Sequence, residues 1–328
     1  MADHIPARFD AEAKFAVIVF LLLALVPLMI GGYTTYILPQ YMCFGILAMS
    51  LALLWGFTGI LSFGQAGFFA IGGYLMGLVL SGQTPFGGFV IALLLAALTG
   101  YAVAVLLGYF LFSAGVRDAY FVLVTLALSI VVEQIAVSQS QLTGGWNGMF
   151  VMRPEVDLTV VKLNLYGDVP AFYTVLAIVA LVYALLHLYT RSRFGKVLVG
   201  MRENEARLMS LGINTSWRKT AAFGLSGAVA AFSGALYAMH SGFVSPSLGG
   251  VLFSTEVVVW VAIAGRTSLL GALLGGVAVS WLSNILSALT PTYWQLFIGL
   301  LFILTIAFFR DGVAGAINQI FRRVRART

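Results

Sequence analysis

The sequence predicts an all-α, polytopic integral membrane protein, a bundle of about ten membrane segments with some broken or half-length, and both termini in the cytoplasm. Three observations predict this fold. Hydrophobic residues make up 61% of the chain and charged residues 9%, whereas soluble domains carry roughly 25% charged residues. Apolar runs close to the length of a membrane-spanning helix recur along the chain. One interior segment, 191–219, is strongly basic, and basic loops stay in the cytoplasm during insertion.

The apolar runs give the order of the segments, because a helical span needs about 20 mainly apolar residues. The candidates are 15–37, 40–57, 65–81, 87–112, 119–137, 170–190, 220–240, 254–265, 268–289 and 293–309. The run at 254–265 is short enough to be half a span. The run after Lys14 is too long for a cleaved signal peptide, so we predict that it is the first retained span.

The basic belt (Arg191–Lys219) orients the bundle, because it holds seven of the eighteen Lys and Arg. Threading from the belt places sixteen of these eighteen inside and leaves only Arg153 and Lys162 outside. This orientation explains the excess of basic over acidic residues, so no nucleic-acid partner is expected. The threading divides the chain into a cytoplasmic segment (1–14), a single transmembrane domain (15–309) and a basic cytoplasmic tail (310–328) that faces acidic headgroups. The transmembrane domain includes an external loop (138–169) and a cytoplasmic loop (191–219).

The stretch from Gly56 to Tyr74, GFTGILSFGQAGFFAIGGY, departs from a plain apolar helix. Irregular backbone at membrane depth needs hydrogen-bond partners, so it is buried in protein or lines a cavity. Thr58, Ser62 and Gln65 have the side chains to supply such partners or to face a solute. Two interpretations stay open, a tight inner turn with close packing and a break that lines a pathway. Glycines four apart, Gly73/Gly77 and Gly271/Gly275, are candidate close helix contacts.

The external loop at 138–169 is longer than a bare connection needs, which favours a functional loop. Its centre, Thr143 to Gly148 (TGGWNG), is typical of a tight, exposed turn with positive φ angles. Trp146 and Asn147 lie at its tip. An ordinary extracellular hairpin and a docking or gating surface remain alternatives.

Two carboxylates fall within predicted spans, Glu133 and Glu256. An ionisable group in a span marks a pathway, a pair or a polar end of the helix. Both are predicted near the outer ends of their spans, where they can reach water, and a place beside a pathway is the alternative.

Within the belt, Arg202–Gly212 (RENEARLMSLG) is predicted to be one short helix. Glu203 and Arg207 are four residues apart and can pair. Leu208 and Leu211 give an apolar edge, and Gly212 is a natural C-terminal stop. A short helix with one apolar edge between basic loops favours docking on a partner over a merely solvated loop.

The motifs exclude several activities. No GxxxxGK[ST] phosphate loop occurs, so energy must come from other chains or from an ion gradient. The single cysteine, Cys43, excludes a disulfide framework. Gly224-Leu225-Ser226-Gly227 matches the GxSG of intramembrane serine proteases, but fourteen helical residues separate Ser226 from His240. That separation is about 21 Å, far beyond hydrogen-bond reach.

Five phrases in order carry a family resemblance: GFTGILSFGQAGFFAIGGY, LTGGWNGM, MRENEARLMSLGIN, KTAAFGLSGAVAAFSGALYA and GLLFILTIAFFRDGVAGAI. Over about 40–315 the chain resembles the M-type membrane subunit of bacterial branched-chain amino acid ABC importers. The resemblance implies an inner-membrane permease with no cofactor of its own, since ATP and Mg²⁺ are bound by partner subunits. It implies four kinds of partner: a second homologous permease, two cytoplasmic ATPases, a periplasmic solute-binding protein and the lipid bilayer.

The resemblance also implies that the belt is the coupling helix that sits in a cleft of an ATPase. The matching positions are Arg202, Glu203, Asn204, Glu205, Ala206, Leu211 and Gly212. The spacing from Glu205 to Gly212 is one residue longer than in the general Glu-Ala-Ala loop of ABC permeases. The resemblance therefore implies the coupling role for these residues but not that exact motif.

Two segments, EVVVWVAIAGRTSLLGALLGG with Trp260 and TYWQLFIG with Trp294, resemble the branch of the family that carries urea or short amides. Arg266 and Thr267 follow a lone Gly265 where the family usually has a Gly pair, and Trp146 stands inside the usual Gly-Gly-x-Asn-Gly. These departures leave branched-chain amino acids, urea and short amides open as solutes.

The sequence therefore favours a permease subunit that moves a small polar solute across the inner membrane. A lining of hydroxyls and amides suits a neutral or zwitterionic solute. The residues expected along its path are Thr58, Ser62, Gln65, Trp146, Asn147, Glu256 and Trp260. The alternative is an ion-coupled secondary transporter, which would use membrane-depth charges such as Glu133 and Glu256.

Overall fold

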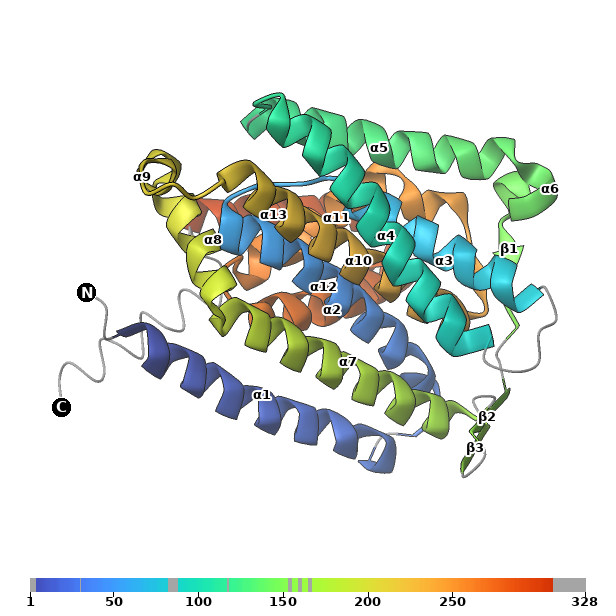
Figure 1. The fold of residues 1–328 in the computed structure, drawn as a ribbon. Coiled ribbons are helices and arrows are strands. Elements are labelled where there is room, and N and C mark those ends of the chain that lie inside the picture. Colours follow the sequence, from blue (N-terminus) through green and yellow to red (C-terminus); the bar gives the residue numbers. More distant parts are fainter. Residues whose placement is uncertain are drawn as a thin grey trace, which may run out of the picture.

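The computed structural model describes residues 4–29, 31–81, 88–116, 118–152, 155–158, 161–164 and 167–308 (Figure 1). The predicted basic tail at 310–328 and Arg153 lie outside the described residues. Helices dominate the described part of the chain, and the α-helices are α1 His4–Met29, α2 Tyr33–Thr58, α3 Gln65–Ser81, α4 Gly88–Ser113, α5 Asp118–Ser138, α6 Ser140–Thr143, α7 Asp168–Arg191, α8 Arg193–Glu203, α9 Glu205–Ser210, α10 Thr215–Ser241, α11 Val251–Ala264, α12 Leu269–Leu289 and α13 Trp294–Phe308.

The number and order of the predicted membrane segments are confirmed. Seven helices are long and apolar enough to cross a membrane, and α3, α11 and α13 are shorter apolar helices, within the described residues. The half-length segment predicted at 254–265 is α11. The first boundary was predicted wrongly, because α1 ends at Met29 and Tyr33 already begins α2. Gly32 between them has a φ of 77°, which interrupts the helix.

The belt and the external loop lie at opposite ends of the bundle (Figure 1). The basic end holds α8, α9 and the start of α1. The hairpin end holds α6 and an antiparallel pair, β2 Glu155–Leu158 with β3 Val161–Asn164. Their placement agrees with the predicted threading, in which the belt and this loop face opposite sides of the membrane.

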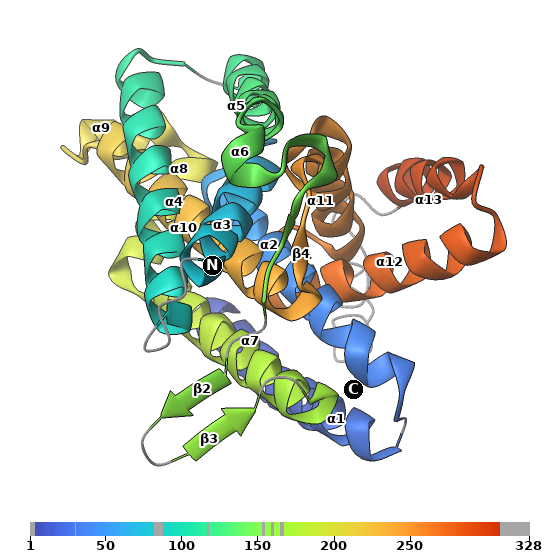
Figure 2. The ribbon, with the colours of Figure 1, turned by 90° about the vertical axis from the view of Figure 1, so that its right-hand side faces the viewer.

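Two of the most buried spans, α2 and α10, form the centre of the bundle. Helix α10 packs against α2, α3 and α4, while α2 also packs against α7 and α12. Helix α1 lies outermost, along α7 (Figure 2). The bundle is therefore organised around the contact between α2 and α10.

Hydrogen bonds repeat every seven residues along this contact, which we call the α2–α10 seam. The α10 side chains Ser226, Ser233 and His240 bond to α2 carbonyl oxygens. The three partners are Ser50 O at 2.7 Å, Cys43 O at 2.5 Å and Tyr36 O at 2.8 Å. Seven residues are about two helical turns, so these side chains share one face of α10. Because lipid supplies no partner for polar groups, side-chain hydrogen bonds between spans stabilise the contact.

Close backbone approach also holds α3 against α10. A Cβ at Gly72 would lie 1.7 Å from the carbonyl oxygen of Ala231, and one at Gly234 would lie 1.8 Å from that of Phe69. Small residues permit such approach where no hydrophobic force draws spans together. Of the predicted close helix contacts, that of Gly275 with Ala264 of α11 and that of Gly73 with the Gly234 carbonyl oxygen of α10 are confirmed. The prediction is wrong for Gly77, which faces Met149 of the external loop instead of a helix.

Short strands close the hairpin end over α3 and α10. Strand β1, Met149–Phe150, pairs antiparallel with β4, Phe243–Val244, which follows α10. A 3₁₀ turn, η2 Pro246–Gly249, then leads into α11. The external loop is thus attached to the connection between α10 and α11.

The α3–α10 contact predicts the effect of adding one methyl group. Gly234→Ala should lower the free energy of unfolding by about 1–3 kcal/mol or more, because the new Cβ would overlap the Phe69 carbonyl oxygen. Gly299→Ala in α13 is the matched control, since no atom lies within 4 Å of a Cβ there. Unfolding in detergent would measure both variants, and equal stability of the two would contradict the close contact.

Candidate functional site

Most of the basic belt folds into two helices, α8 and α9, and its last residues form the first turn of α10. The prediction of one helix over Arg202–Gly212 is wrong at Asn204. This residue leaves the helical conformation, with φ −160° and ψ 98°, and its Oδ1 accepts a hydrogen bond from the Arg207 N–H at 3.0 Å. Asn is a favoured N-cap, which explains why α9 begins here. The predicted stop is confirmed, because Gly212 has a φ of 79° and the Ile213 N–H donates to the Leu208 carbonyl at 3.2 Å.

Arg202 anchors α8 to the C-terminal end of α2. One terminal nitrogen of its guanidinium donates to the Gly56 carbonyl oxygen. The last carbonyls of a helix lack partners and carry partial negative charge, so a cation is favoured there. The other terminal nitrogen pairs with Glu203 at 2.8 Å. The predicted pair between Glu203 and Arg207 is therefore wrong, because the break at Asn204 separates these residues onto different helices.

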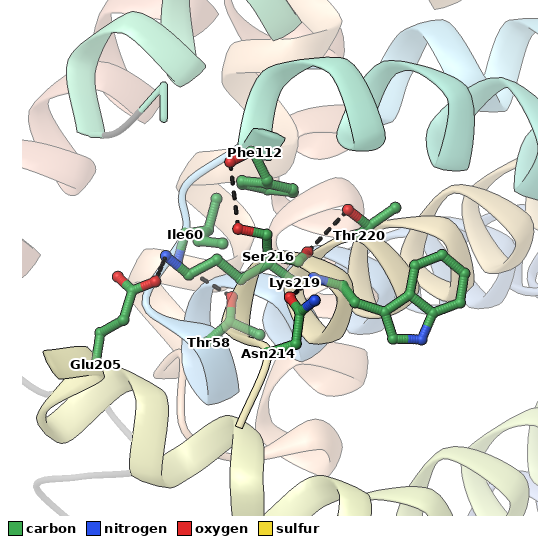
Figure 3. A network of polar contacts seen from close by, with 9 residues as sticks. Thr58, Ile60, Phe112, Glu205, Asn214, Ser216, Lys219 and Thr220 are labelled. Atoms are coloured by element: carbon green, nitrogen blue, oxygen red, sulfur yellow. Dashed lines mark hydrogen bonds and ion pairs between the residues drawn. The ribbon is translucent and has the colours of Figure 1, made fainter. Parts of the chain in front are cut away.

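Glu205 joins α9 to the beginning of α10 through an ion pair with Lys219, Nζ to Oε1 2.7 Å (Figure 3). Both side chains are largely shielded from solvent, so salt screens the pair less than an exposed one. Asn214 caps α10 by accepting from the Trp217 N–H at 3.0 Å, and Ser216 donates to the Phe112 carbonyl at 3.3 Å. The belt is thus attached to both helices of the seam.

The belt presents apolar side chains outward at the basic end. Leu211 is 70% exposed, and Met209 and Trp217 are also exposed. The predicted apolar edge therefore holds for Leu211. It does not hold for Leu208, which turns inward onto Gly200. Ala206 is exposed on the first turn of α9.

The irregular stretch is short, 59–64, and lies at the basic end, where Gly59 faces the Arg202 side chain. Its backbone is satisfied by hydroxyl groups. Thr58 Oγ1 accepts from the Ile60 N–H at 3.3 Å and Ser62 Oγ from the Gly64 N–H at 3.1 Å. These contacts support the interpretation as a tight, packed turn.

Helix α5 supplies two further hydroxyls to the same turn. Thr125 Oγ1 accepts from the Phe63 N–H at 3.1 Å, and Ser129 Oγ donates to the Phe63 carbonyl at 2.8 Å. Since free backbone groups at membrane depth need partners, these residues allow the chain to turn without a regular helix.

Gln65 connects the turn to the α2–α10 seam. Its amide nitrogen donates to Ser226 Oγ at 2.9 Å, and its oxygen accepts from Ser50 Oγ at 3.1 Å. Ser226 in turn donates to the Ser50 carbonyl at 2.7 Å. All three side chains are buried and mutually satisfied. Ser226, the residue of the protease-like GxSG, therefore has a packing role.

At the hairpin end the predicted positive-φ turn is confirmed. Gly144, Gly145 and Gly148 have φ angles of 75°, 59° and 72° around a 3₁₀ turn, η1 Gly145–Asn147. Trp146 is 77% exposed and Asn147 is also exposed. A large aromatic side chain held outward by a rigid turn is suited to contact lipid headgroups or another protein.

The remaining predicted pathway residues lie on α11. Trp260 is buried, with its ring centroid 5.3 Å from that of Phe44 and 5.6 Å from that of Phe253. Glu256 is half-buried one turn nearer the start of the helix. Glu133 of α5 reaches Gly250, which precedes α11, where the positive end of the helix favours a carboxylate. The predicted pathway residues are therefore spread along the bundle.

Sequence reasoning missed the residues that hold these elements together. Ser50, Ser129 and Ser233 act through partners far away in the chain, which a pattern of single residues does not reveal. Lys219 pairs with Glu205 across the turn between α9 and α10. One signal was present, since Lys219, Ser226, Ser233 and His240 recur every seven residues along a helix that is mainly apolar after Thr220. Such a stripe indicates one polar face.

The fold and the site define a multi-span membrane protein with a rigidly attached basic belt at one end. A model of the family described as "Branched-chain amino acid transport system / permease component" matches residues 33–306. The chain belongs to this family. It is accordingly a membrane permease component, a class that has no nucleotide-binding domain of its own.

Several relatives are similar to the chain. The permease protein LivM of a high-affinity branched-chain amino acid transport system from Salmonella typhimurium LT2 is 30% identical over 273 residues, covering 76% of this chain and 63% of LivM. LivM from Escherichia coli K12 is 29% identical over 289 residues, covering 81% and 67%. The xylose transport system permease protein XylH from Escherichia coli K12 is 30% identical over 139 residues, covering 40% and 35%. No solved structure matches the chain.

The Gln65 network predicts an effect on stability. Gln65→Leu should lower the free energy of unfolding by about 1–3 kcal/mol, because the buried hydroxyls of Ser50 and Ser226 lose a partner. Gln134→Leu on the exposed face of α5 is the matched control. Unfolding in detergent measures both variants. Unchanged stability of Gln65→Leu together with altered solute selectivity would favour the pathway interpretation instead.

Proposed function

We propose that the chain is the permease subunit of an ATP-driven ABC importer in a bacterial inner membrane. The solutes that fit the proposal are branched-chain amino acids and small related polar molecules, including urea and short amides. Its partners would be a second homologous permease, two cytoplasmic ATPases that bind ATP and Mg²⁺, and a periplasmic solute-binding protein. Family membership and the permease names of the relatives support the proposal.

The observation that carries the proposal is the way the belt is built. Its outward side offers Leu211, Met209 and Trp217 among basic residues, which suits docking on another protein. Its inward side is fastened at two points, through Arg202 and through Glu205. A partner that moves α8 and α9 would therefore move the ends of α2 and α10 with them.

The coupling role of Arg202, Glu203, Asn204, Glu205, Ala206, Leu211 and Gly212 divides between these two sides. Arg202 and Glu205 fasten the belt, Asn204 and Gly212 set the bounds of α9, and Glu203, Ala206 and Leu211 face the partner. This division makes separate changes to attachment and to docking testable.

In the proposed cycle a loaded binding protein docks at the hairpin end near Trp146 and Asn147. ATP-driven closure of the ATPases shifts α8 and α9, and the seam tilts. The solute then passes Glu256 and the packed turn that Thr58, Ser62 and Gln65 hold in place. Trp260 would shape this route through its aromatic neighbours. Since a permease must release its solute, neutral hydroxyls and amides suit this lining better than strong charges.

The test removes both attachments of the belt. The double variant Arg202→Ala/Glu205→Ala should assemble with its partners at wild-type levels but lose most ATP-driven uptake of leucine or urea into proteoliposomes. Arg193→Ala removes an exposed basic side chain from the same belt and serves as the control. Wild-type uptake by the double variant would contradict the coupling role. Uptake abolished by a protonophore but independent of ATP would favour an ion-coupled secondary transporter.

A further inference from the structure

One carboxylate of α1 binds the first turn of α12. Glu12 Oε1 accepts hydrogen bonds from Ser268 Oγ at 2.8 Å and from the Leu270 N–H at 3.1 Å. Ser268 is the N-cap of α12 and also accepts from the Gly271 N–H at 2.9 Å. Glu12 and Ser268 therefore satisfy amide donors that the first turn of a helix leaves without intrahelical partners.

Burial and charge make this contact a specific attachment. Glu12 is half-buried, and the positive end of a helix favours a carboxylate. Elsewhere α1 packs mainly on α7 and exposes most of its apolar side chains. The predicted cytoplasmic segment at 1–14 thus contains a residue that reaches into the bundle.

The first turn of α12 is itself held against α2. The connection that precedes α12 packs so closely on Gly56 that a Cβ there would lie 1.9 Å from the Arg266 carbonyl oxygen. The Arg266 guanidinium lies 5.6 Å from the centroid of the Trp55 ring, where a cation is attracted to the aromatic face. Gly56 is also the residue whose carbonyl oxygen accepts from Arg202.

These contacts form one continuous chain at the basic end. It runs from Glu12 through Ser268 to Arg266, and from there through Gly56 to Arg202. The links are hydrogen bonds, the short covalent backbone from Ser268 to Arg266 and the close contact of Arg266 with Gly56, so no loose segment absorbs a displacement. The belt is thereby joined to α1 and α12 as well as to the seam.

We propose that Glu12 is a positioning residue, which holds the starts of α1 and α12 on the end of α2 where Arg202 binds. Movement of α8 then displaces α1 and α12 together with the seam. This inference rests on the proposed function for its consequence in transport. The physical coupling between Glu12 and Arg202 is a property of the chain alone.

Hydrogen–deuterium exchange of the full chain in lipid nanodiscs tests the coupling without partner proteins or solute. Glu12→Ala removes the acceptor and should raise exchange about tenfold in the first turn of α12. It should also raise exchange around Arg202, which a purely local helix cap would not do. Glu12→Gln keeps an acceptor oxygen and should restore most of the protection at both places.

Coupling is reciprocal, so Arg202→Ala should raise exchange at Leu270 and Gly271. Glu133→Ala, which changes a carboxylate near the start of α11, is the matched control and should leave the basic end unchanged. If Glu12→Ala does not fold, Ser268→Ala removes one link of the same series of contacts. Its exchange is measured in the first turn of α12 and around Arg202.

Exchange that rises only in α12 for the Glu12 or Ser268 variants, and only in the belt for Arg202→Ala, would overturn the inference. That result would leave the proposed importer function untouched. Conversely, wild-type uptake by the Arg202→Ala/Glu205→Ala variant would contradict the importer mechanism. The exchange experiment would still test the coupling between Glu12 and Arg202.

Discussion

The α2–α10 seam is the constraint on which the rest of the structure depends. Side chains on one face of α10 bond to the α2 backbone once every seven residues, at Ser226, Ser233 and His240. In a bilayer the hydrophobic effect does not draw spans together, so packing and hydrogen bonds must do so. With α2 and α10 joined, α3 and α4 cover α10, and α7 and α12 cover α2.

The position of the belt follows from this centre. Arg202 binds the C-terminal end of α2, and Glu205 pairs with Lys219 near the N-terminal end of α10. These two ends are neighbours because the seam is antiparallel, as the pairing of Ser50 with Ser226 and Tyr36 with His240 requires. A force applied to the belt therefore reaches both central helices at once, which fits a permease component driven from outside the chain.

The ten segments were predictable because hydropathy and length report directly on burial in lipid. The stop at Gly212, just after α9, was predictable because a left-handed residue after a helix depends on local backbone chemistry. Other features depend on residues that only the fold brings together. Gln65 and Ser226 are 161 positions apart, and Glu12 and Ser268 are 256 apart. The break at Asn204 was missed because continuous helical spacing from Arg202 to Leu211 outweighed the capping preference of a single Asn.

The central claim is that the belt and the seam move as one body. Spin labels at exposed positions test it, because buried Cys43 leaves introduced cysteines as the accessible thiols. In the complex with the proposed ATPase partners, the account predicts an unchanged distance between labels at Arg193 of α8 and Tyr33 of α2 when ATP binds. The distance between labels at Arg193 and Leu142, which spans the bundle, should change. A shift of Arg193 relative to Tyr33 with a fixed distance to Leu142 would contradict the account.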